Sequence, residues 1–481
     1  MAVLSWALAA AVTLFSAVAA FHALLTKRDS RAALGWIAVC LVFPFLGPVF
    51  YFLFGINRVR TRAREMHARY DFALGEVYDP LADEPGDDHP PPATDAVLPP
   101  DLAEIARVGS SVSRRALVEG NEVTVLHAGE RAFPEMLAAI EAAEAFVYLT
   151  TYIFETNHTG RLFIDALAAA SARGVDVRVM IDGVGEWYSW PRAGSLLRRR
   201  SVRVARFLPP KLLPPTVHIN LRNHRKILVT DRGSAFTGGM NIGDRHLADD
   251  QSNPYRVVDA HFRLRGPIVS HFSRLFLDDW RFITGESIET PNIVVDKAGT
   301  AVCRTIVDGP DEDFDKLLMV LIGIVSVARR RLLVMTPYFL PPAGLVAAMQ
   351  AAALRGVDVS VILPERSNLP YVHWATRNML WELVQRGVRV YEQPAPFVHT
   401  KLLVMDEAYS QIGSANIDPR SLRLNFEVAV EVYDRNLAST LAAHFEDVRQ
   451  RSRRVTLHEL ASRPLGTRTR DAAAWLFSPY L

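Results

Sequence analysis

The distribution of apolar residues divides the chain into an N-terminal part and a longer remainder. Residues 2–26 carry no charged side chain unless His22 is protonated, and residues 32–57 carry none. Each run is long enough to cross a hydrocarbon core of about 30 Å. The first run lacks the basic start and the short apolar core of a signal peptide. The pattern predicts an N-terminal pair of transmembrane helices within residues 1–60, although Pro44 and Pro48 leave a kinked or re-entrant second segment open.

Basic residues flank the second apolar run on both sides. Lys27, Arg28 and Arg31 precede it, and a denser set of four arginines follows it within residues 58–64. The positive-inside rule would place both flanks in the cytoplasm, which is not possible if the second run spans the membrane. Because the denser cluster follows the second run, we expect the larger part of the chain to lie in the cytoplasm.

The remainder of the chain alternates between helical and extended patterns, and the pattern occurs twice. Residues 61–100 form a basic flank followed by an acidic, proline-rich linker. Beyond it, residues 166–182 and 348–364 each predict a helix, a glycine turn and a strand, and both contain the pentapeptide RGVDV. Such alternation predicts an α/β fold, and the duplication predicts two α/β/α halves, residues 101–290 and 291–481.

Composition narrows the classes of protein that fit. The chain has 481 residues, of which 49% are hydrophobic, so more than one domain with an ample core is expected. The net charge of +2 lacks the basic excess typical of a nucleic-acid-binding protein. Of the two cysteines, Cys40 lies in an apolar run and Cys303 is distant in sequence, so no disulfide is predicted.

One stretch, HTKLLVMDEAYSQIGSAN, combines a buried strand with polar side chains suited to chemistry. His399 and Lys401 are two residues apart and therefore point to one face of an extended strand. Ser414 and Asn416 show the same spacing on a second short strand. An imidazole, an ammonium, a hydroxyl and a carboxamide suit phosphoryl transfer, with the histidine as nucleophile or acid/base and the others on phosphate oxygens.

The same stretch occurs earlier in the chain, as HRKILVTDRGSAFTGGMN. The matching residues of the two copies are all 175 positions apart; they are His224, Lys226, Asp231, Gly239 and Asn241 against His399, Lys401, Asp406, Ser414 and Asn416. One H-x-K-x-x-x-x-D motif is a weak signal, but two copies in identical phase make coincidence very improbable.

The doubled motif resembles the signature of the phospholipase D superfamily. The flanking segments GGMNIGDRHL and GSANIDPRSLRLNFEV are similar to those of bacterial cardiolipin synthases. The resemblance implies two halves about a pseudo-twofold axis with one active site between them. It further implies a multi-pass enzyme of the bacterial inner membrane that makes cardiolipin and glycerol from two phosphatidylglycerol molecules through a phosphohistidine intermediate.

Several alternatives remain open at this point. One alternative is a phospholipase D-type hydrolase, and another is a transphosphatidylase that uses another alcohol or phospholipid. A membrane-tethered nuclease fits the neutral charge poorly, and the intact motifs argue against a silent lipid-binding scaffold. The sequence does not tell whether the chain forms a homo-oligomer, or whether two apolar loops, residues 207–215 and 393–398, enter the bilayer.

The resemblance assigns roles within each motif. His224 is expected to be the nucleophile and His399 the acid/base, although the near-symmetry of the copies prevents the sequence from deciding. Lys226 and Lys401 would neutralise charge on the phosphoryl oxygens. The groups expected to bind the substrate phosphate are Asn241, Asn416 and Ser414.

Carboxylates complete the candidate site. Asp231 and Asp406 belong to the catalytic motif, but each stands at the end of a strand, where structural anchoring is at least as good an explanation as catalysis. Each histidine also needs a partner that holds its tautomer, and Asp259 and Glu427 are predicted to be these carboxylates. No set of His, Cys and Asp has zinc-ligand spacing, so neither a metal nor another cofactor is predicted.

Overall fold

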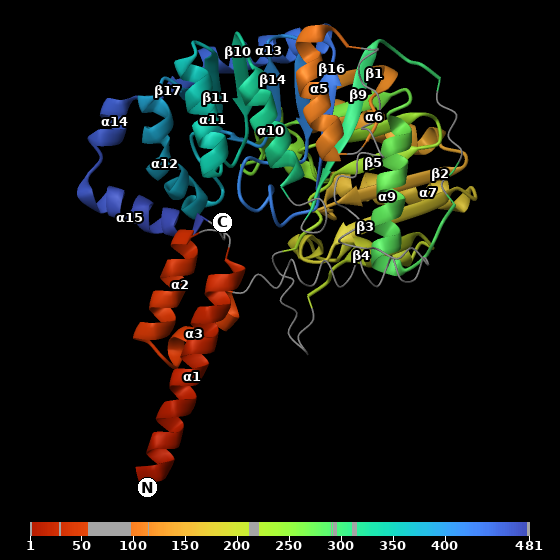
Figure 1. The fold of residues 1–481 in the computed structure, drawn as a ribbon. Coiled ribbons are helices and arrows are strands. Elements are labelled where there is room, and N and C mark those ends of the chain that lie inside the picture. Colours follow the sequence, from red (N-terminus) through yellow and green to blue (C-terminus); the bar gives the residue numbers. More distant parts are fainter. Residues whose placement is uncertain are drawn as a thin grey trace, which may run out of the picture. The chain divides into compact units, whose positions relative to one another are not determined.

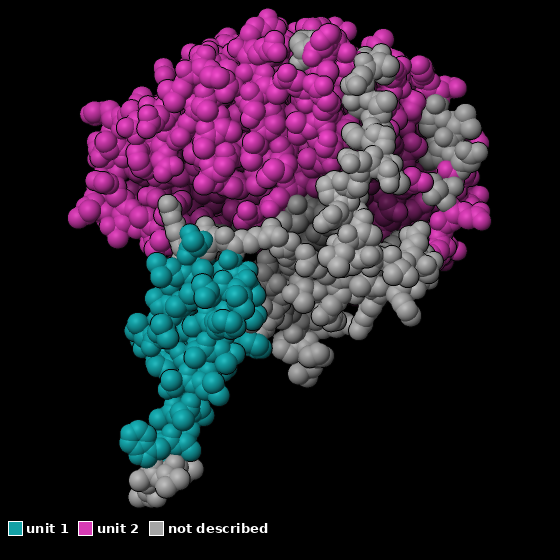
Figure 2. Space-filling model, in the orientation of Figure 1, with its two compact units in different colours: residues 1–69 teal, residues 70–481 magenta. Residues whose placement is uncertain are grey.

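The structure of the protein is a computed structural model. It describes residues 2–27, 30–55, 98–113, 115–210, 221–289, 291, 296–309 and 315–478. The chain forms two compact units, residues 1–69 and residues 70–481 (Figure 2). Most of the predicted linker and the arginines within residues 58–64 lie outside the described residues.

The smaller unit is built on one long apolar helix. Helix α1 (Ala2–Thr26) extends about 37 Å, enough to cross a bilayer. The helix that follows, α2 (Ser30–Val42), has 13 residues and reaches only about 20 Å. It ends at Val42 because Pro44 disfavours helical geometry at the residue before it. Within the described residues, one helix therefore meets the length for spanning a membrane.

The second apolar segment folds back on itself beside α1. After α2 the chain continues through α3 (Leu46–Phe50) and a π-helical turn, Tyr51–Gly55. Ser16 Oγ donates to the carbonyl oxygen of Cys40 at 2.5 Å, His22 Nδ1 lies 2.7 Å from the Tyr51 hydroxyl, and Lys27 donates to the carbonyl oxygen of Gly55. Figure 1 shows α2 and α3 beside the C-terminal half of α1. The predicted second membrane-spanning helix is thus corrected to a broken, re-entrant hairpin, which begins and ends beside the same end of α1.

One 15-stranded sheet runs through the larger unit. The strands among the described residues of this unit, including the separate pair β7 and β13, are β1 (Val118–His127), β2 (Phe146–Thr151), β3 (Asp176–Asp182), β4 (Arg203–Phe207), β5 (Ile227–Thr230), β6 (Ser234–Gly238), β7 (Val257–Val258), β8 (Ala260–Arg265), β9 (Ala301–Asp308), β10 (Arg331–Met335), β11 (Asp358–Pro364), β12 (Arg389–Gln393), β13 (Phe397–Val398), β14 (Leu402–Met405), β15 (Tyr409–Gly413), β16 (Glu427–Tyr433) and β17 (Arg453–Arg454).

The strand order reads the same outward in both directions from the centre. On one side it is β1-β8-β6-β5-β2-β3-β4, and on the other it is β9-β16-β15-β14-β10-β11-β12, with β17 added at the edge. Strands β1 and β9 pair antiparallel in the middle. This order is what two copies of one unit produce when a twofold axis stands perpendicular to a shared sheet. The two halves therefore share one sheet.

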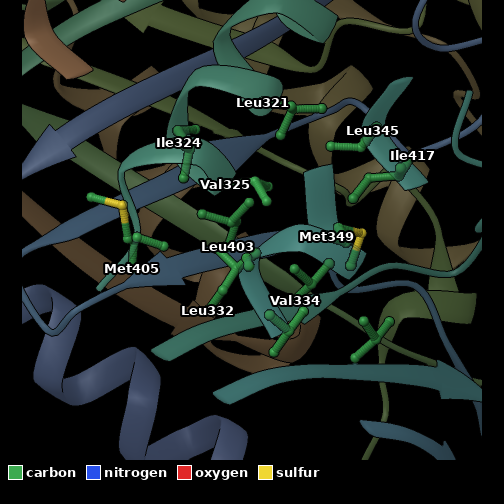
Figure 3. Close-up of a cluster of buried hydrophobic side chains, with 14 of the residues drawn as sticks. Leu321, Ile324, Val325, Leu332, Val334, Leu345, Met349, Leu403, Met405 and Ile417 are labelled. Atoms are coloured by element: carbon green, nitrogen blue, oxygen red, sulfur yellow. The ribbon is translucent and has the colours of Figure 1, made fainter. Parts of the chain in front are cut away.

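Helices cover both faces of the sheet. They are α5 (Pro100–Ser113), α6 (Ala128–Ala142), α7 (His158–Ala172), α8 (Ala193–Arg198), α9 (Val269–Thr284), α10 (Lys316–Val327), α11 (Ala343–Leu354), α12 (Pro370–Gln385), α13 (Arg435–Gln450), α14 (Leu457–Ala461) and α15 (Leu465–Leu476). Alternate residues of each strand serve opposite layers: Val147 packs with α6 and α7, whereas Tyr148 packs with α9. In the other half, Leu332 and Val334 pack under α10 and α11 (Figure 3).

The repeated RGVDV pentapeptide closes the same turn in both halves. Gly174 and Gly356 have φ values of 90° and 93°, which favour glycine. The guanidinium of Arg173 donates to three carbonyl oxygens at the end of α6, and that of Arg355 does the same at the end of α10. The arginine thereby satisfies carbonyl groups that a helix end leaves without partners.

Candidate active site

The two histidine motifs meet where the halves join. His224 stands just before β5, and its backbone N–H donates to the carbonyl oxygen of Phe426 at 3.0 Å. His399 stands just before β14, and its N–H donates to the carbonyl oxygen of Val258 at 2.8 Å. In both cases the acceptor belongs to the opposite half. The backbone therefore ties each histidine to the partner half.

The residues that follow these acceptors are the two predicted orienting carboxylates. Nδ1 of His224 lies 3.0 Å from Oε1 of Glu427, and Nδ1 of His399 lies 2.9 Å from Oδ2 of Asp259. The carboxylates are fully buried, and the histidine side chains are only 13% and 11% exposed. Each histidine thus pairs with the carboxylate of the other half. With Nδ1 engaged, Nε2 is the ring nitrogen left for chemistry.

The lysines of the two motifs are buried and are held in the same way. Nζ of Lys226 donates to the carbonyl oxygen of His224 at 2.6 Å, and Nζ of Lys401 donates to that of His399 at 2.7 Å. Burial lowers the pKa of Lys226 to about 7 and that of Lys401 to about 8, although Glu427 and Asp259 both favour the charged forms. A bound anion would therefore stabilise the charged form of both lysines.

The histidines and lysines of the two motifs also affect one another's pKa. Burial lowers the pKa of both histidines. Lys401, Lys226 and His224 lower the pKa of His399 further, and the two lysines do the same to His224. Such mutual effects require short separations. The predicted histidines and lysines of the two motifs therefore lie in one buried cluster, together with Glu427 and Asp259.

Ser414 holds one of the two carboxylates, and its predicted binding of a substrate phosphate stays a prediction. Its Oγ donates to Oε2 of Glu427 at 2.5 Å and accepts from the N–H of Val428 at 3.1 Å. The first copy has Gly239 here, and a Cβ at that residue would lie 2.5 Å from the carboxylate oxygens of Asp259. The shorter aspartate therefore needs glycine beside it, whereas the longer glutamate leaves room for a serine that holds it.

The two asparagines occupy matching positions just after β6 and just after β15. Oδ1 of Asn241 accepts from the N–H of Ile153 at 3.0 Å, which turns its NH₂ group the other way. Nδ2 of Asn416 donates to Ser421 Oγ at 3.2 Å, and its buried Oδ1 has no hydrogen-bond partner among the described residues. Phosphate binding by these residues stays a prediction.

The two aspartates of the motifs lie away from the histidines. Each is five residues beyond its lysine, about 16 Å along an extended strand. The carboxylate of Asp406 accepts from the N–H groups of residues 329–331, each at 2.8 Å, just before β10. Asp231 accepts from the N–H groups of Glu144 and Phe146 at 3.2 Å, at the start of β2. This geometry favours the anchoring role over the catalytic one.

Replacing Asp406 by alanine should therefore affect stability. The change removes the acceptor of three N–H groups, and we expect the free energy of unfolding to fall by about 2 kcal/mol. Thermal unfolding of the detergent-solubilised protein measures this as a lower midpoint. The matched control is Asp447→Ala, an exposed partner of Arg451 on α13 that should cost less than about 0.5 kcal/mol. Equal midpoints for the two variants would contradict the anchoring role.

Several residues of the site were not predicted from the sequence. The guanidinium of Arg225 donates to the carbonyl oxygen of Glu427 at 3.1 Å and pairs with Asp279 on α9, so it fixes the strand that carries Glu427. The ring of Tyr152 lies 5.4 Å from that of His224 and 5.7 Å from Nζ of Lys226. Two features of the sequence could have indicated these residues: Arg225 lies inside the first motif, and Tyr152 lies at the end of a strand that is repeated in the second half.

Of the two apolar loops, one contributes to the described site. The ring of Phe397 lies 6.0 Å from that of His399. The other loop falls largely within residues 211–220, outside the described residues. Across the described ranges, no three His, Cys, Asp or Glu side chains are grouped as a metal site. The absence of a metal requirement stays a prediction.

Comparisons with known proteins agree with this arrangement. The family model described as "Cardiolipin synthase, PLD-like domain" matches residues 136–280 and 321–449, which lie in the two halves. The model described as "Phospholipase_D-nuclease N-terminal" matches residues 14–55.

Full-length relatives support the same family, and one solved structure has the same fold. The cardiolipin synthase of Geobacillus kaustophilus (strain HTA426) is 32% identical over 95% of this chain and 90% of that protein. The major cardiolipin synthase ClsA of Bacillus subtilis (strain 168) is 31% identical over 95% of this chain and 95% of that protein. The phosphatidylserine synthase of Haemophilus influenzae Rd KW20 has a TM-score of 0.61 at 15% identity, over 78% of this chain and 100% of that one, which shows a shared fold.

Proposed function

The chain belongs to the bacterial cardiolipin synthases of the phospholipase D superfamily, and from this premise we propose that it joins two phosphatidylglycerol molecules into cardiolipin and glycerol at the membrane. It is an enzyme of that superfamily, and its homologues support phosphatidyl transfer between phospholipids. The observation that carries the proposal is the crossed pairing of each histidine with the carboxylate of the other half. This pairing supports one site that uses two histidines in different roles.

In the first proposed step, the phosphatidyl group is transferred to the enzyme. Nε2 of neutral His224 attacks the phosphorus of phosphatidylglycerol, and a P–N bond forms as the P–O bond to the terminal glycerol breaks. The anionic phosphate of the bound lipid favours the protonated form of His399, which gives its proton to the departing glycerol oxygen. Lys226 and Lys401 carry the charge that neutralises the phosphoryl oxygens.

In the second proposed step, another lipid takes the phosphatidyl group. The terminal hydroxyl of a second phosphatidylglycerol gives its proton to His399 and attacks phosphorus, and the P–N bond to His224 breaks. His399 is then protonated again and His224 is neutral, so the cycle is balanced. Cardiolipin and glycerol are the two products.

The assignment of His224 as nucleophile is supported by the two carboxylates. Burial alone would raise the pKa of Glu427, but His224, Lys226 and Ser414 together hold it below its usual value. Burial raises the pKa of Asp259. An ionised carboxylate at Nδ1 of His224 would stabilise the positive charge that the ring gains when Nε2 attacks phosphorus.

The lysines predict how activity changes with pH. A lysine is charged below its pKa, so kcat/KM for a phosphatidyl ester of p-nitrophenol, whose leaving group needs no proton from His399, should fall as the pH rises above about 7 to 8, where Lys226 and Lys401 lose their protons in the free enzyme. In Lys226→Arg the side chain stays protonated throughout, and the alkaline limb should then follow Lys401 alone, near pH 8. Rates in mixed micelles from about pH 6 to about pH 9.5 measure this limb. An alkaline limb that is identical in Lys226→Arg would contradict the role of Lys226.

We also infer the membrane arrangement from the smaller unit. Because the second segment begins and ends beside the same end of α1, a single crossing by α1 places Ser5 and the larger unit on opposite sides of the membrane. The basic runs that follow Thr26 and Gly55 in the sequence then belong to one side, which removes the conflict in the positive-inside rule. That side is the cytoplasm, where the larger unit acts.

Cysteine labelling tests this topology. In a variant with Cys40 and Cys303 replaced by alanine, a membrane-impermeant maleimide added to spheroplasts should label Ser5→Cys but not Ser252→Cys. Permeabilised membranes should give labelling at both positions, which controls for reactivity. Protection of both residues in intact spheroplasts would indicate two full crossings and would refute the re-entrant hairpin.

Product analysis tests the function itself. Purified full-length protein in phosphatidylglycerol liposomes should release labelled glycerol and accumulate cardiolipin in equal amounts. A hydrolase, which uses water as acceptor, would yield phosphatidic acid instead. A transphosphatidylase for another alcohol would form cardiolipin only slowly, and would form the phosphatidyl ester of that alcohol once it was added. Either of these last two results would replace the proposed function.

A further inference from the structure

An exposed aromatic loop follows β3 in the first half. Trp187, Tyr188 and Trp190 have exposed fractions of 56%, 56% and 84%. Three large aromatic side chains within four residues are rarely left to water without a partner. We call Trp187, Trp190 and the neighbouring Arg192 the tryptophan platform.

The backbone beneath the platform is firmly held. Oδ1 of Asp182 accepts from the N–H groups of Val184 and Gly185 at 2.8 and 3.0 Å. Further along, Thr156 Oγ1 lies 2.7 Å from Ser189 Oγ and donates to the carbonyl oxygen of Pro191 at 2.9 Å. The indoles therefore project from a well-anchored loop, and their exposure is a built feature of the fold.

The chemistry of the platform suits a phospholipid headgroup layer. The guanidinium carbon of Arg192 lies 5.9 Å from the ring centroids of both Trp187 and Trp190. Indole rings prefer the boundary between headgroups and acyl chains, and an arginine among them provides donors for lipid phosphate. A protein partner would be recognised equally by the rings, but among the described residues no carboxylate forms an ion pair with Arg192, and the neighbouring Glu186 pairs with Arg206 instead, which favours an anionic surface.

The platform also adjoins the active site. The ring of Tyr188, between the two tryptophans, lies 6.3 Å from that of Tyr152, and Tyr152 lies 5.4 Å from the ring of His224. Two ring contacts, Tyr188 with Tyr152 and Tyr152 with His224, thus connect the loop that carries the platform to the site. A surface bound at the platform would be within reach of the histidines.

We propose that the tryptophan platform is an interfacial anchor that seats the entrance of the active site on the phospholipid headgroup layer. Helix α1 keeps the protein on the membrane but belongs to a different unit from the active site, so a contact within the larger unit is needed to orient the entrance of the site. The platform supplies this orientation, so that lipid headgroups enter the site without leaving the bilayer. The inference rests on the proposed function only in taking a membrane phospholipid as substrate.

The first experiment compares two substrates in the full-length protein with Trp187→Ser and Trp190→Ser together. The protein is reconstituted into phosphatidylcholine vesicles and is given long-chain phosphatidylglycerol in the bilayer or dihexanoyl phosphatidylglycerol in solution. Release of labelled glycerol is counted, whatever the acceptor. We expect turnover of the bilayer substrate to fall by about tenfold, with turnover of the soluble substrate unchanged. The matched control is Trp381→Ser, a tryptophan of α12 that is 48% exposed.

The second experiment detects the contact directly. A lipid-sensitive fluorophore on Trp190→Cys, with Cys40 and Cys303 replaced by alanine, should be quenched by doxyl-labelled phosphatidylcholine and shielded from aqueous iodide. The same fluorophore on Trp381→Cys should show the reverse. Equal iodide quenching at both positions would overturn the proposal and would favour a protein partner for the platform.

The outcomes separate the platform from the proposed function. Equal loss on both substrates would place the tryptophans in the site itself, and no loss on either would leave them without a role; both results overturn the proposal. If released glycerol is matched by phosphatidic acid and not by cardiolipin, the proposed synthase function fails. The ratio between bilayer and soluble substrate still tests the platform in that case.

Discussion

Replacing His224 by alanine is expected to reduce cardiolipin formation by more than about 10⁴-fold, and His399→Ala is expected to do the same with natural substrate. The first change removes the proposed nucleophile, and the second removes the proton needed by the departing glycerol. Labelled phosphatidylglycerol in liposomes measures the loss. His158→Ala, at an exposed position at the start of α7, is the matched control and should retain full activity.

A substrate with an acidic leaving group separates the two roles. In a phosphatidyl ester of p-nitrophenol, the leaving group is p-nitrophenolate, which departs without taking up a proton. With this ester, His399→Ala should regain much of its rate of phosphatidyl transfer to the enzyme, whereas His224→Ala should not. Denaturation in SDS at neutral to mildly alkaline pH, which preserves the P–N bond, should then trap labelled lipid on the His399→Ala protein. Recovery in His224→Ala instead would reverse the two assignments. More than about a tenth of wild-type activity in either variant with natural substrate would point to independent sites.

The second large effect is expected at the carboxylates that cross between the halves. Glu427→Gln keeps the shape of the side chain but removes the charge that orients and stabilises His224, so kcat should fall by roughly 10²- to 10⁴-fold. Asp259→Asn should have a similar effect through His399. Glu382→Gln, an exposed residue of α12, is the isosteric control and should leave kcat unchanged.

The same activated ester tests the crossed pairing. Asp259→Asn acts on the proposed acid, so the ester should restore its rate. Glu427→Gln acts on the proposed nucleophile, so its defect should remain. If the two variants respond in the opposite way, each carboxylate would serve the histidine of its own half, contrary to the observed geometry. Ser414→Ala, which removes the hydroxyl that holds Glu427, should lower kcat less, by about tenfold.

Much of the fold is readable from local patterns. The alternation within strands and the turn glycines of RGVDV are dictated by backbone geometry, so the two α/β/α halves follow from the residues themselves. The pairing of β1 with β9, which joins the halves into one sheet, was not predicted, because neither strand has a repeat-specific pattern. The re-entrant second segment stayed one alternative among several, because apolar length alone does not show where a chain turns.

The sequence by itself determined which residues take part: the doubled His-Lys-Asn set, the two later carboxylates and the apolar N-terminus. These features are composition and spacing, which act over a few residues. Only the tertiary structure decided how they pair. His224 meets a carboxylate 203 positions away and His399 meets one 140 positions away, because the twofold arrangement brings the end of each half against the start of the other motif. The same packing directed Ser414 to Glu427 and brought the carboxylates of Asp231 and Asp406, which the sequence already placed at strand ends, to the backbone N–H groups at the starts of β2 and β10. Contacts of this kind depend on how whole sheets pack, and no local pattern records them.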